Sequence, residues 1–188
     1  HEALTDNFLH VNGSSARPRP ASESDKEIPA HGVSVVEVRK TAGKFGYVQA
    51  SAFNRRITPL TPVQIGGPLR GNALMKTKYD PTGNTTRGTI NNCGTGQTPW
   101  GSFLTGEENW AGYFTRAAAD DAARADKSVV SLNRYGRAQG AASRHGWETS
   151  GADDKYARWN ISRSGASADG SDDYRNELLW SPERPTLL

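Results

Sequence analysis

The stretch Gly32-Val33-Ser34-Val35-Val36-Glu37-Val38 decides the fold class, because valine recurs along it and β-branched side chains favour extended backbone. Behind it, Ala42-Gly43-Lys44 predicts a tight turn, and residues 45–49 predict a second strand. Two strands joined by so short a turn indicate a β-hairpin.

Turn-forming residues continue this pattern along the chain. It contains 20 Gly and 10 Pro, which favours many turns and few long helices. A third extended segment is expected within residues 64–77, and residues 80–84 form a turn by composition. Residues 86–91 are apolar at alternate positions and should be a strand that delivers Cys93 to its end. We therefore expect a mainly β fold of short strands with long loops.

Four further segments complete the expected arrangement. Residues 117–127 are rich in alanine, which predicts one short peripheral helix with little apolar face. Residues 128–132 are a further strand candidate. Residues 11–29, rich in Ser, Pro and charge, are expected to be a loop or disordered, and residues 151–173 are expected to be loop-rich. Within the last segment, Tyr156, Trp159 and Ile161 are the expected anchors, and residues 1–188 are interpreted as a single region.

Composition narrows the function. A hydrophobic content of 35% is lean for 188 residues, so the core should be small or incomplete. The net charge of +3 is spread without a basic stripe, which disfavours nucleic acid as a specific partner. No apolar run is long enough to insert into a membrane as a helix. The chain begins at His1, so a removed export signal or a longer parent protein stays open.

One glycine-broken segment, residues 91–109, has the make-up of a metal site. It holds Cys93, the only cysteine, together with the adjacent carboxylates Glu107 and Glu108. A single thiol cannot form an internal disulfide, and the flanking glycines let the backbone approach an ion closely. Neighbouring residues in a strand point to opposite faces, so a bend or bulge is needed for both carboxylates to serve one cluster.

The order of several motifs resembles the PhoX family of bacterial alkaline phosphatases. The matching motifs are His1-Glu2, Ala30-His31-Gly32-Val33-Ser34-Val35-Val36-Glu37-Val38, Asn54-Arg55-Arg56-Ile57-Thr58, Asn92-Cys93, Thr98-Pro99-Trp100-Gly101 and Glu107-Glu108-Asn109. The resemblance implies a β-propeller enzyme, periplasmic or secreted, that hydrolyses phosphate esters with iron and calcium. It also implies that the chain is an inner portion of such a protein.

Carried over residue by residue, the resemblance implies a set of metal ligands and phosphate contacts. Cys93 matches a thiolate that binds Fe3+, and the carboxylates expected to bind the metals are Glu2, Glu107, Glu108 and Glu177. These roles agree with the preference of iron for thiolate and of Ca2+ for oxygen. Arg55 and Arg56 could hold a phosphate-ester substrate by bidentate contacts. The chain departs from the family at Gly106, at Gly94-Thr95-Gly96 and after Asn176-Glu177.

Plainer interpretations stay open beside these. Cys93 could be a buried small hydrophobe, and Glu107 and Glu108 could be solvated surface charges. His31 is expected to be a strand-entry residue with a satisfied hydrogen bond rather than a catalytic base, and Trp100 and Trp110 are expected to pack in the core or within a propeller blade. The competing function is a non-catalytic calcium- or phosphate-binding fragment. Open sheet edges would let such a fragment self-associate.

Overall fold

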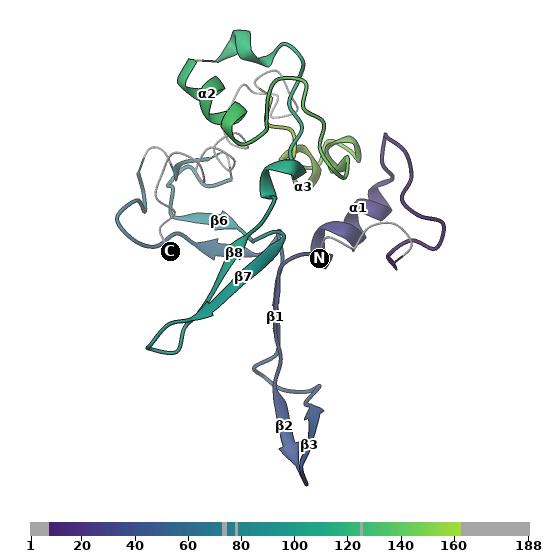
Figure 1. Ribbon diagram of the computed structural model, residues 1–188, viewed down its shortest axis with the longest axis vertical. Coiled ribbons are helices and arrows are strands. Elements are labelled where there is room, and N and C mark those ends of the chain that lie inside the picture. Colours follow the sequence, from purple (N-terminus) through teal and green to yellow (C-terminus); the bar gives the residue numbers. More distant parts are fainter. Residues whose placement is uncertain (1–7, 73–74, 78, 125, 163–188) are drawn as a thin grey trace.

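The computed structural model describes residues 8–72, 75–77, 79–124 and 126–162, and Figure 1 shows their arrangement. The helices are α1 (Ala21–Glu27), α2 (Asp126–Arg134) and α3 (Asp154–Ala157). The strands are β1 (Val33–Val35), β2 (Val38–Thr41), β3 (Lys44–Tyr47), β4 (Arg55–Ile57), β5 (Pro62–Gln64), β6 (Thr85–Arg87), β7 (Asn92–Gln97) and β8 (Phe103–Glu107). Turns of 3-10 helix lie at Ile28–Ala30, Trp110–Tyr113, Asp120–Ala123 and Trp147–Thr149.

The strands form four small antiparallel sheets in the described part of the chain. The pairs are β1 with β4, β2 with β3, β5 with β6, and β7 with β8. Small sheets and few helices confirm the prediction of a mainly β fold. The described residues do not close into a propeller, so that part of the fold stays a prediction.

The first predicted hairpin is present in a shifted form. The turn lies at Ala42 and Gly43, whose φ angles of 50° and 80° suit a two-residue hairpin turn between β2 and β3. The prediction that Gly32–Val38 is one strand of this hairpin was wrong in part. Val33–Val35 pairs instead with β4, and only Val38 onwards pairs with β3.

The strand expected at residues 86–91 ends early. β6 stops at Arg87 because Gly88 turns the chain with a φ of 52°. A Cβ at Gly88 would lie 2.1 Å from the backbone oxygen of Thr58, so only glycine allows this close approach. Cys93 therefore lies inside a separate strand, β7, rather than at the end of β6.

A compact aromatic cluster forms the core. Its buried members are Ile28, Ile90, Tyr113, Phe114, Leu132, Trp147, Tyr156, Ala157, Trp159 and Ile161. The expected anchors of the C-terminal segment are confirmed, since Tyr156 is 4%, Trp159 1% and Ile161 0% exposed. α3 interrupts the loop predicted for residues 151–173, and residues 163–173 lie outside the described range.

α1 contradicts the loop predicted within residues 11–29. The pattern gave no sign of it because the helix buries polar side chains rather than an apolar stripe. Ser24 and Glu27 are 0% and 1% exposed, and the Ser24 hydroxyl lies 2.6 Å from that of Ser150. Glu27 accepts a 2.6 Å hydrogen bond from the Trp147 indole, which fastens α1 to the core.

The peripheral helix lies later than expected. Among the described residues of this range there is only the 3-10 turn Asp120–Ala123 and the start of α2, and Arg116 and Arg124 both pair with the buried carboxylate of Asp120 in that turn. The strand predicted for residues 128–132 is part of α2. Ser131 and Leu132 are buried whereas Val130 is 59% exposed, which is a helical rather than an alternating pattern.

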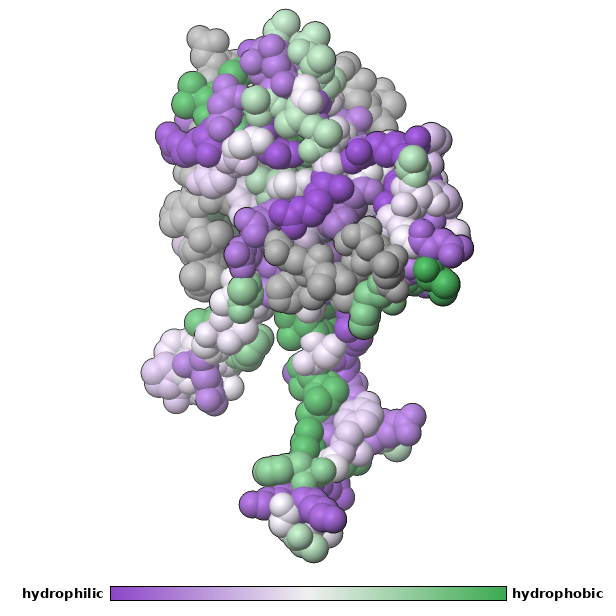
Figure 2. All heavy atoms as spheres, turned by 45° about the vertical axis from the view of Figure 1, so that its right-hand side comes forward, coloured by the Kyte–Doolittle hydropathy of each residue, from purple (hydrophilic) through white to green (hydrophobic). Residues whose placement is uncertain are grey.

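Two hairpins project from this body (Figures 1 and 2). All residues of β2 and β3 are exposed, with Phe45 73% and Tyr47 58% exposed. Trp100 lies in the turn of the β7–β8 hairpin and is 78% exposed, so its predicted core position was wrong. Trp110 does pack against the core, as expected. No helix among the described residues has the length and apolarity needed to cross a membrane.

Candidate metal site on the β7–β8 hairpin

The β7–β8 hairpin contains a bulge at the predicted thiolate ligand. Asn92 pairs with Glu107, and Thr95 pairs with Thr105, so β7 has one extra residue between these two pairs. Cys93 lies in this interval and is exposed. A bulge bends its strand and re-aims the local side chains. The adjacent carboxylates Glu107 and Glu108 led us to expect a bend or bulge in their own strand. The hairpin does contain a bulge, but it lies in the opposite strand, β7.

Two asparagines with left-handed backbone flank the predicted ligands. Asn91, before Cys93, has a φ of 47°, and Asn109, after Glu108, has a φ of 52°. Asn91 is 1% exposed and its amide donates to the backbone oxygen of Glu108, whose own N–H donates to the Asn91 oxygen over 2.9 Å. Asparagine is among the residues that tolerate this conformation. The two chain ends of the hairpin are thereby fastened together at Glu108.

Polar contacts hold the carboxylate of Glu107. Its Oε1 accepts hydrogen bonds from the Thr89 hydroxyl over 2.9 Å and from the Ile90 N–H over 2.7 Å. The Asn92 amide in turn donates to the Thr89 hydroxyl over 2.8 Å and to the Thr105 hydroxyl over 3.1 Å. This network extends across β7 and β8 and gives Glu107 a defined orientation.

The other predicted ligands are only partly brought together. Cys93, Glu107 and Glu108 share one hairpin and are all exposed. They do not form a group of three whose ligand atoms lie within 4.8 Å of one another in the described part of the chain. Glu2 and Glu177, which would complete the predicted set, lie outside the described residues.

The two predicted phosphate contacts lie together on β4. Arg56 donates to the backbone oxygen of Pro29 over 2.7 Å and to that of His31 over 3.0 Å, and it also reaches the Ser34 hydroxyl. This guanidinium therefore fastens β4 to the segment before β1. Arg55 is exposed and donates to the Phe53 oxygen over 3.2 Å.

A second cluster of possible ligands lies around Glu27, and no motif in the sequence indicates it. Ligand atoms of His10, Glu23 and Glu27 all lie within 4.8 Å, and the His10 ring lies 2.8 Å from the Glu27 carboxylate. Arg19 forms ion pairs with both carboxylates. A guanidinium in this position neutralises the acids and repels a cation, so we assign the cluster a structural role. These residues lie in a segment without apolar periodicity, so the sequence pattern did not predict that they lie close together.

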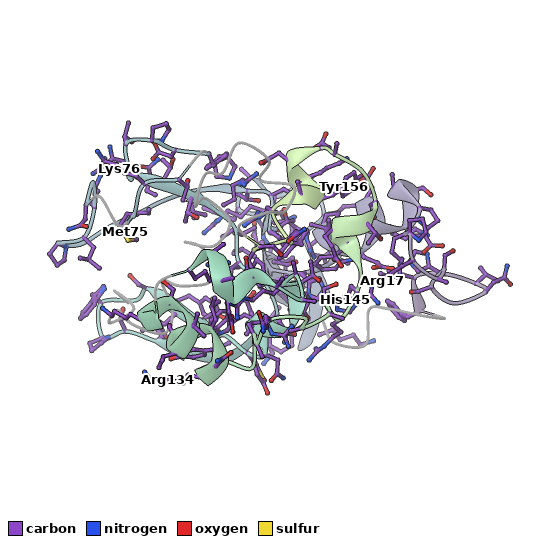
Figure 3. The ribbon with its side chains drawn as sticks, turned by 90° about the horizontal axis from the view of Figure 1, so that it is seen from above. Arg17, Met75, Lys76, Arg134, His145 and Tyr156 are labelled. Atoms are coloured by element: carbon purple, nitrogen blue, oxygen red, sulfur yellow. The ribbon has the colours of Figure 1, made fainter. Side chains whose placement is uncertain are left out.

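His31 and His145 are buried neighbours in the aromatic core. Their ring centroids lie 6.2 Å apart, and His145 stacks on Trp147 at 4.9 Å. Burial lowers the pKa of His31 to about 4, and repulsion from Arg144 adds to this effect. Burial also lowers the pKa of His145 to about 3, with further repulsion from His31, Arg144, Arg19 and Arg17. Figure 3 shows His145 in the interior with Arg17 nearby. His31 lies just before β1, as expected, but the expected satisfied hydrogen bond was wrong, since its buried Nδ1 has no hydrogen-bond partner among the described residues.

The donor chemistry of the hairpin suits a mixed metal site. Cys93 offers a soft thiolate, and Glu107 and Glu108 offer hard carboxylate oxygens. The amide oxygen of Asn92 is buried and accepts no hydrogen bond from any described residue. The donor types of Cys93, Glu107 and Glu108 therefore match the metals that the family resemblance implies, whereas their ligand atoms are not gathered around one point in the described part of the chain.

Comparisons with known proteins agree on one family. The family model "Alkaline phosphatase PhoX" matches residues 1–153. Among solved structures, the chain is similar to Pseudomonas fluorescens PhoX in complex with vanadate, a transition state analogue, with a TM-score of 0.71 and 31% sequence identity. This match covers 95% of the chain and 29% of the Pseudomonas protein. A comparison with curated proteins found no match.

The two matches rest on different observations. The family model compares sequence alone, whereas the structural match also compares the fold. The family model includes the hairpin with Cys93, Glu107 and Glu108, which lies inside residues 1–153. The chain belongs to the PhoX family of alkaline phosphatases.

Proposed function

We propose that the chain takes part in the metal-dependent hydrolysis of phosphate esters. The observation that carries this proposal is the similarity of 95% of the chain to a PhoX protein solved with vanadate. Vanadate is described there as a transition state analogue, and it resembles phosphate in charge and shape. The substrate class proposed for this chain is therefore a small phosphate ester.

The proposed metals are Fe3+ and Ca2+. Cys93 would supply a thiolate to iron, whereas Glu107 and Glu108 would supply oxygen ligands to calcium, with Glu2 and Glu177 as further members of the set. Bound cations would neutralise the negative charge that builds up on the phosphoryl oxygens during the reaction. The hydrogen bonds from Thr89 and Ile90 keep one oxygen of Glu107 fixed, which pre-organises this ligand.

Arg55 and Arg56 have different roles within this proposal. Both terminal nitrogens of Arg56 donate hydrogen bonds to Pro29, His31 and Ser34, so this side chain positions β4. Arg55 is exposed on the same strand and is the better candidate to contact a substrate phosphate. A β-propeller architecture and a periplasmic or secreted location belong to the same proposal, on the strength of the family resemblance.

A binding-only role is the second candidate. The chain spans 29% of the length of its solved relative, so the ligands and substrate contacts supplied by the remaining length of such a protein are not all represented here. A chain of this extent could bind calcium or phosphate through the β7–β8 hairpin without turnover.

One experiment separates these functions. The chain is purified, loaded with Fe3+ and Ca2+, analysed by elemental mass spectrometry and assayed with a chromogenic phosphate ester at alkaline pH. The catalytic proposal expects turnover that exhaustive chelation removes, and a visible thiolate-to-iron absorption band that is lost in Cys93→Ser. Bound calcium without turnover would support the binding-only role, and a colourless protein that retains neither metal would contradict both.

A further inference from the structure

The β2–β3 hairpin has two chemically different faces. Val38 is the cross-strand partner of Tyr47, and Lys40 is the partner of Phe45, so these four side chains leave the hairpin on one side. The opposite side carries the intervening positions, which are Arg39, Thr41, Lys44 and Gly46. One side is therefore mainly apolar, and we call Val38, Phe45 and Tyr47 the apolar face. The other side is basic.

Alternation of this kind is typical of a strand pair whose apolar side packs on a core. No described element covers the apolar face, since Val38 is 51%, Tyr47 58% and Phe45 73% exposed. The hairpin is a sheet of two strands, and it projects from the body with hydrophobic residues along it (Figures 1 and 2). The sequence pattern is that of a buried sheet, whereas the structure leaves the sheet uncovered.

The hairpin is fastened only at its base. The Asn54 side chain accepts a hydrogen bond from the Glu37 N–H over 2.8 Å and donates to the Val48 oxygen over 2.9 Å. Towards the turn, the Lys40 ammonium lies 5.4 Å from the centre of the Phe45 ring, which is a contact within the hairpin itself. A two-stranded hairpin is marginally stable in water unless another strand or layer packs against it. The apolar face therefore needs a partner.

A lipid surface and a second copy of the chain fit this face poorly. A lipid surface that took up the apolar face would leave Arg39 and Lys44 turned away from the phosphates that attract such cations. A stable dimer through this face would bring two Lys40 ammonium groups into one interface, where like charges are unfavourable. An apolar protein surface carries neither penalty.

The solved relative indicates which protein surface this is. The chain covers 29% of the Pseudomonas protein, so most of that polypeptide lies outside the matched region. We propose that the apolar face docks on the remaining length of a PhoX-type polypeptide, with Phe45 and Tyr47 as anchors and the basic side left in solvent. The proposal holds whether that polypeptide continues this chain or binds it as a separate molecule. It goes beyond the proposed function, because neither anchor belongs to the metal or phosphate contacts.

Co-expression tests this interface. The probe is the part of Pseudomonas fluorescens PhoX outside the matched region, produced together with the tagged 188-residue chain and recovered by affinity capture. Hydrogen exchange of residues 38–47 is then followed by mass spectrometry. We expect the chain to capture the probe and the hairpin amides to exchange more slowly in the complex than in the chain alone.

Matched variants identify the face. Phe45→Ser and Phe8→Ser alter side chains that are 73% and 77% exposed, so both chains should fold normally. Phe45→Ser should lower the captured amount about tenfold or more, as loss of an aromatic anchor does, whereas Phe8→Ser should stay within about twofold of the unchanged chain. Lys44→Gln, on the basic side, should also stay within about twofold.

Several results would overturn the inference. These are absence of capture with a soluble probe, equal losses in Phe45→Ser and Phe8→Ser, and a loss in Lys44→Gln without one in Phe45→Ser. Binding to anionic phospholipid vesicles, or a dimer in the dilute chain, that Phe45→Ser abolishes would assign the face to lipid or to a second copy instead.

A second measurement decides if the probe is insoluble. This chain then replaces the matched region in intact Pseudomonas PhoX, and hairpin exchange as fast as in the free chain overturns the inference. Turnover is not a readout in either experiment, so failure here leaves the proposed function standing.

Discussion

The buried histidine pair predicts that the fold loses stability in mild acid. His31 and His145 have folded-state pKa values of about 4 and about 3, below the ordinary value of 6.5. At pH values between the folded-state pKa and 6.5, each histidine is protonated in the unfolded chain and neutral in the folded chain. Stability contributed by the two neutral rings is therefore complete above pH 6.5 and decreases as the pH falls towards the folded-state values.

The magnitude depends mainly on the unfolded-state pKa as long as the folded-state values stay below the assay pH. An assay at about pH 5 lies about 1.5 pH units below the unfolded-state pKa of 6.5. Protonation of the unfolded chain should therefore lower the free energy of unfolding by about 2 kcal/mol for each histidine and by about 4 kcal/mol for the pair. Glu23 and Asp25 have lowered pKa values too, since each carboxylate accepts hydrogen bonds. Their ordinary pKa values are 4.5 and 3.8, so their contribution to stability changes only below about pH 5, outside the range of the assay.

Urea unfolding at about pH 7.5 and about pH 5, followed by tryptophan fluorescence, measures this loss. Trp147 stacks on His145 and should report the transition. His145→Phe keeps an aromatic ring against Trp147 but cannot take up a proton, so about half of the pH dependence should disappear. An unfolding free energy that is equal at both pH values, or a full loss retained in His145→Phe, would refute this reasoning.

Three further outcomes follow from the fold. Glu27→Gln should destabilise the protein by about 1–3 kcal/mol in the same urea assay, because it removes the more buried of the two carboxylates that pair with Arg19 and leaves only Glu23 to balance this guanidinium; a change below about 0.5 kcal/mol would contradict the role given to this carboxylate. Trp100→Ser should change stability by less than about 0.5 kcal/mol, since this side chain is 78% exposed, and a larger loss would show that the turn of the hairpin is packed. The open β2–β3 hairpin should make the chain self-associate at high concentration in sedimentation experiments, and Phe45→Lys should reduce this, so a monomer at all concentrations would count against it.

Local features of the fold were predictable where backbone chemistry decides them. The Ala42-Gly43 turn followed from residue type alone, and the anchors Tyr156 and Trp159 followed from their size in a polar segment. A bend or bulge was expected from the adjacent carboxylates Glu107 and Glu108, and the hairpin has one, but in the opposite strand, β7. These inferences depend only on residues close together in the sequence, so a single sequence is enough to make them.

Contacts between distant segments were not predictable in the same way. α1 is held by polar bonds to residues more than a hundred positions away, from Ser24 to Ser150 and from Glu27 to Trp147. β6 ends where Gly88 meets the backbone of Thr58, a contact with no local signal. The amide orientation of Asn92 depends on Thr89 and Thr105 together, and no spacing rule expresses that.

A matched pair of carboxylate-to-amide variants suits the central claim. Glu148 lies outside the hairpin, but it is unsuitable as a control because its side chain is 8% exposed and accepts a hydrogen bond from Ser143. Asp153 is exposed, and its side chain accepts from the Lys155 N–H over 3.0 Å at the start of α3. Asn serves equally well in that capping position, so Asp153→Asn alters charge without altering structure.

The most direct measurement is the rate of hydrolysis of a chromogenic phosphate ester at alkaline pH with Ca2+ and Fe3+ supplied, compared between Glu107→Gln and Asp153→Asn. We expect Glu107→Gln to lose about a hundredfold or more in rate, because an amide binds the cation weakly, and Asp153→Asn to stay within about twofold of the unchanged chain. Equal losses in both variants, turnover that survives exhaustive chelation, or no turnover in the fully loaded chain would contradict metal-dependent catalysis at the β7–β8 hairpin.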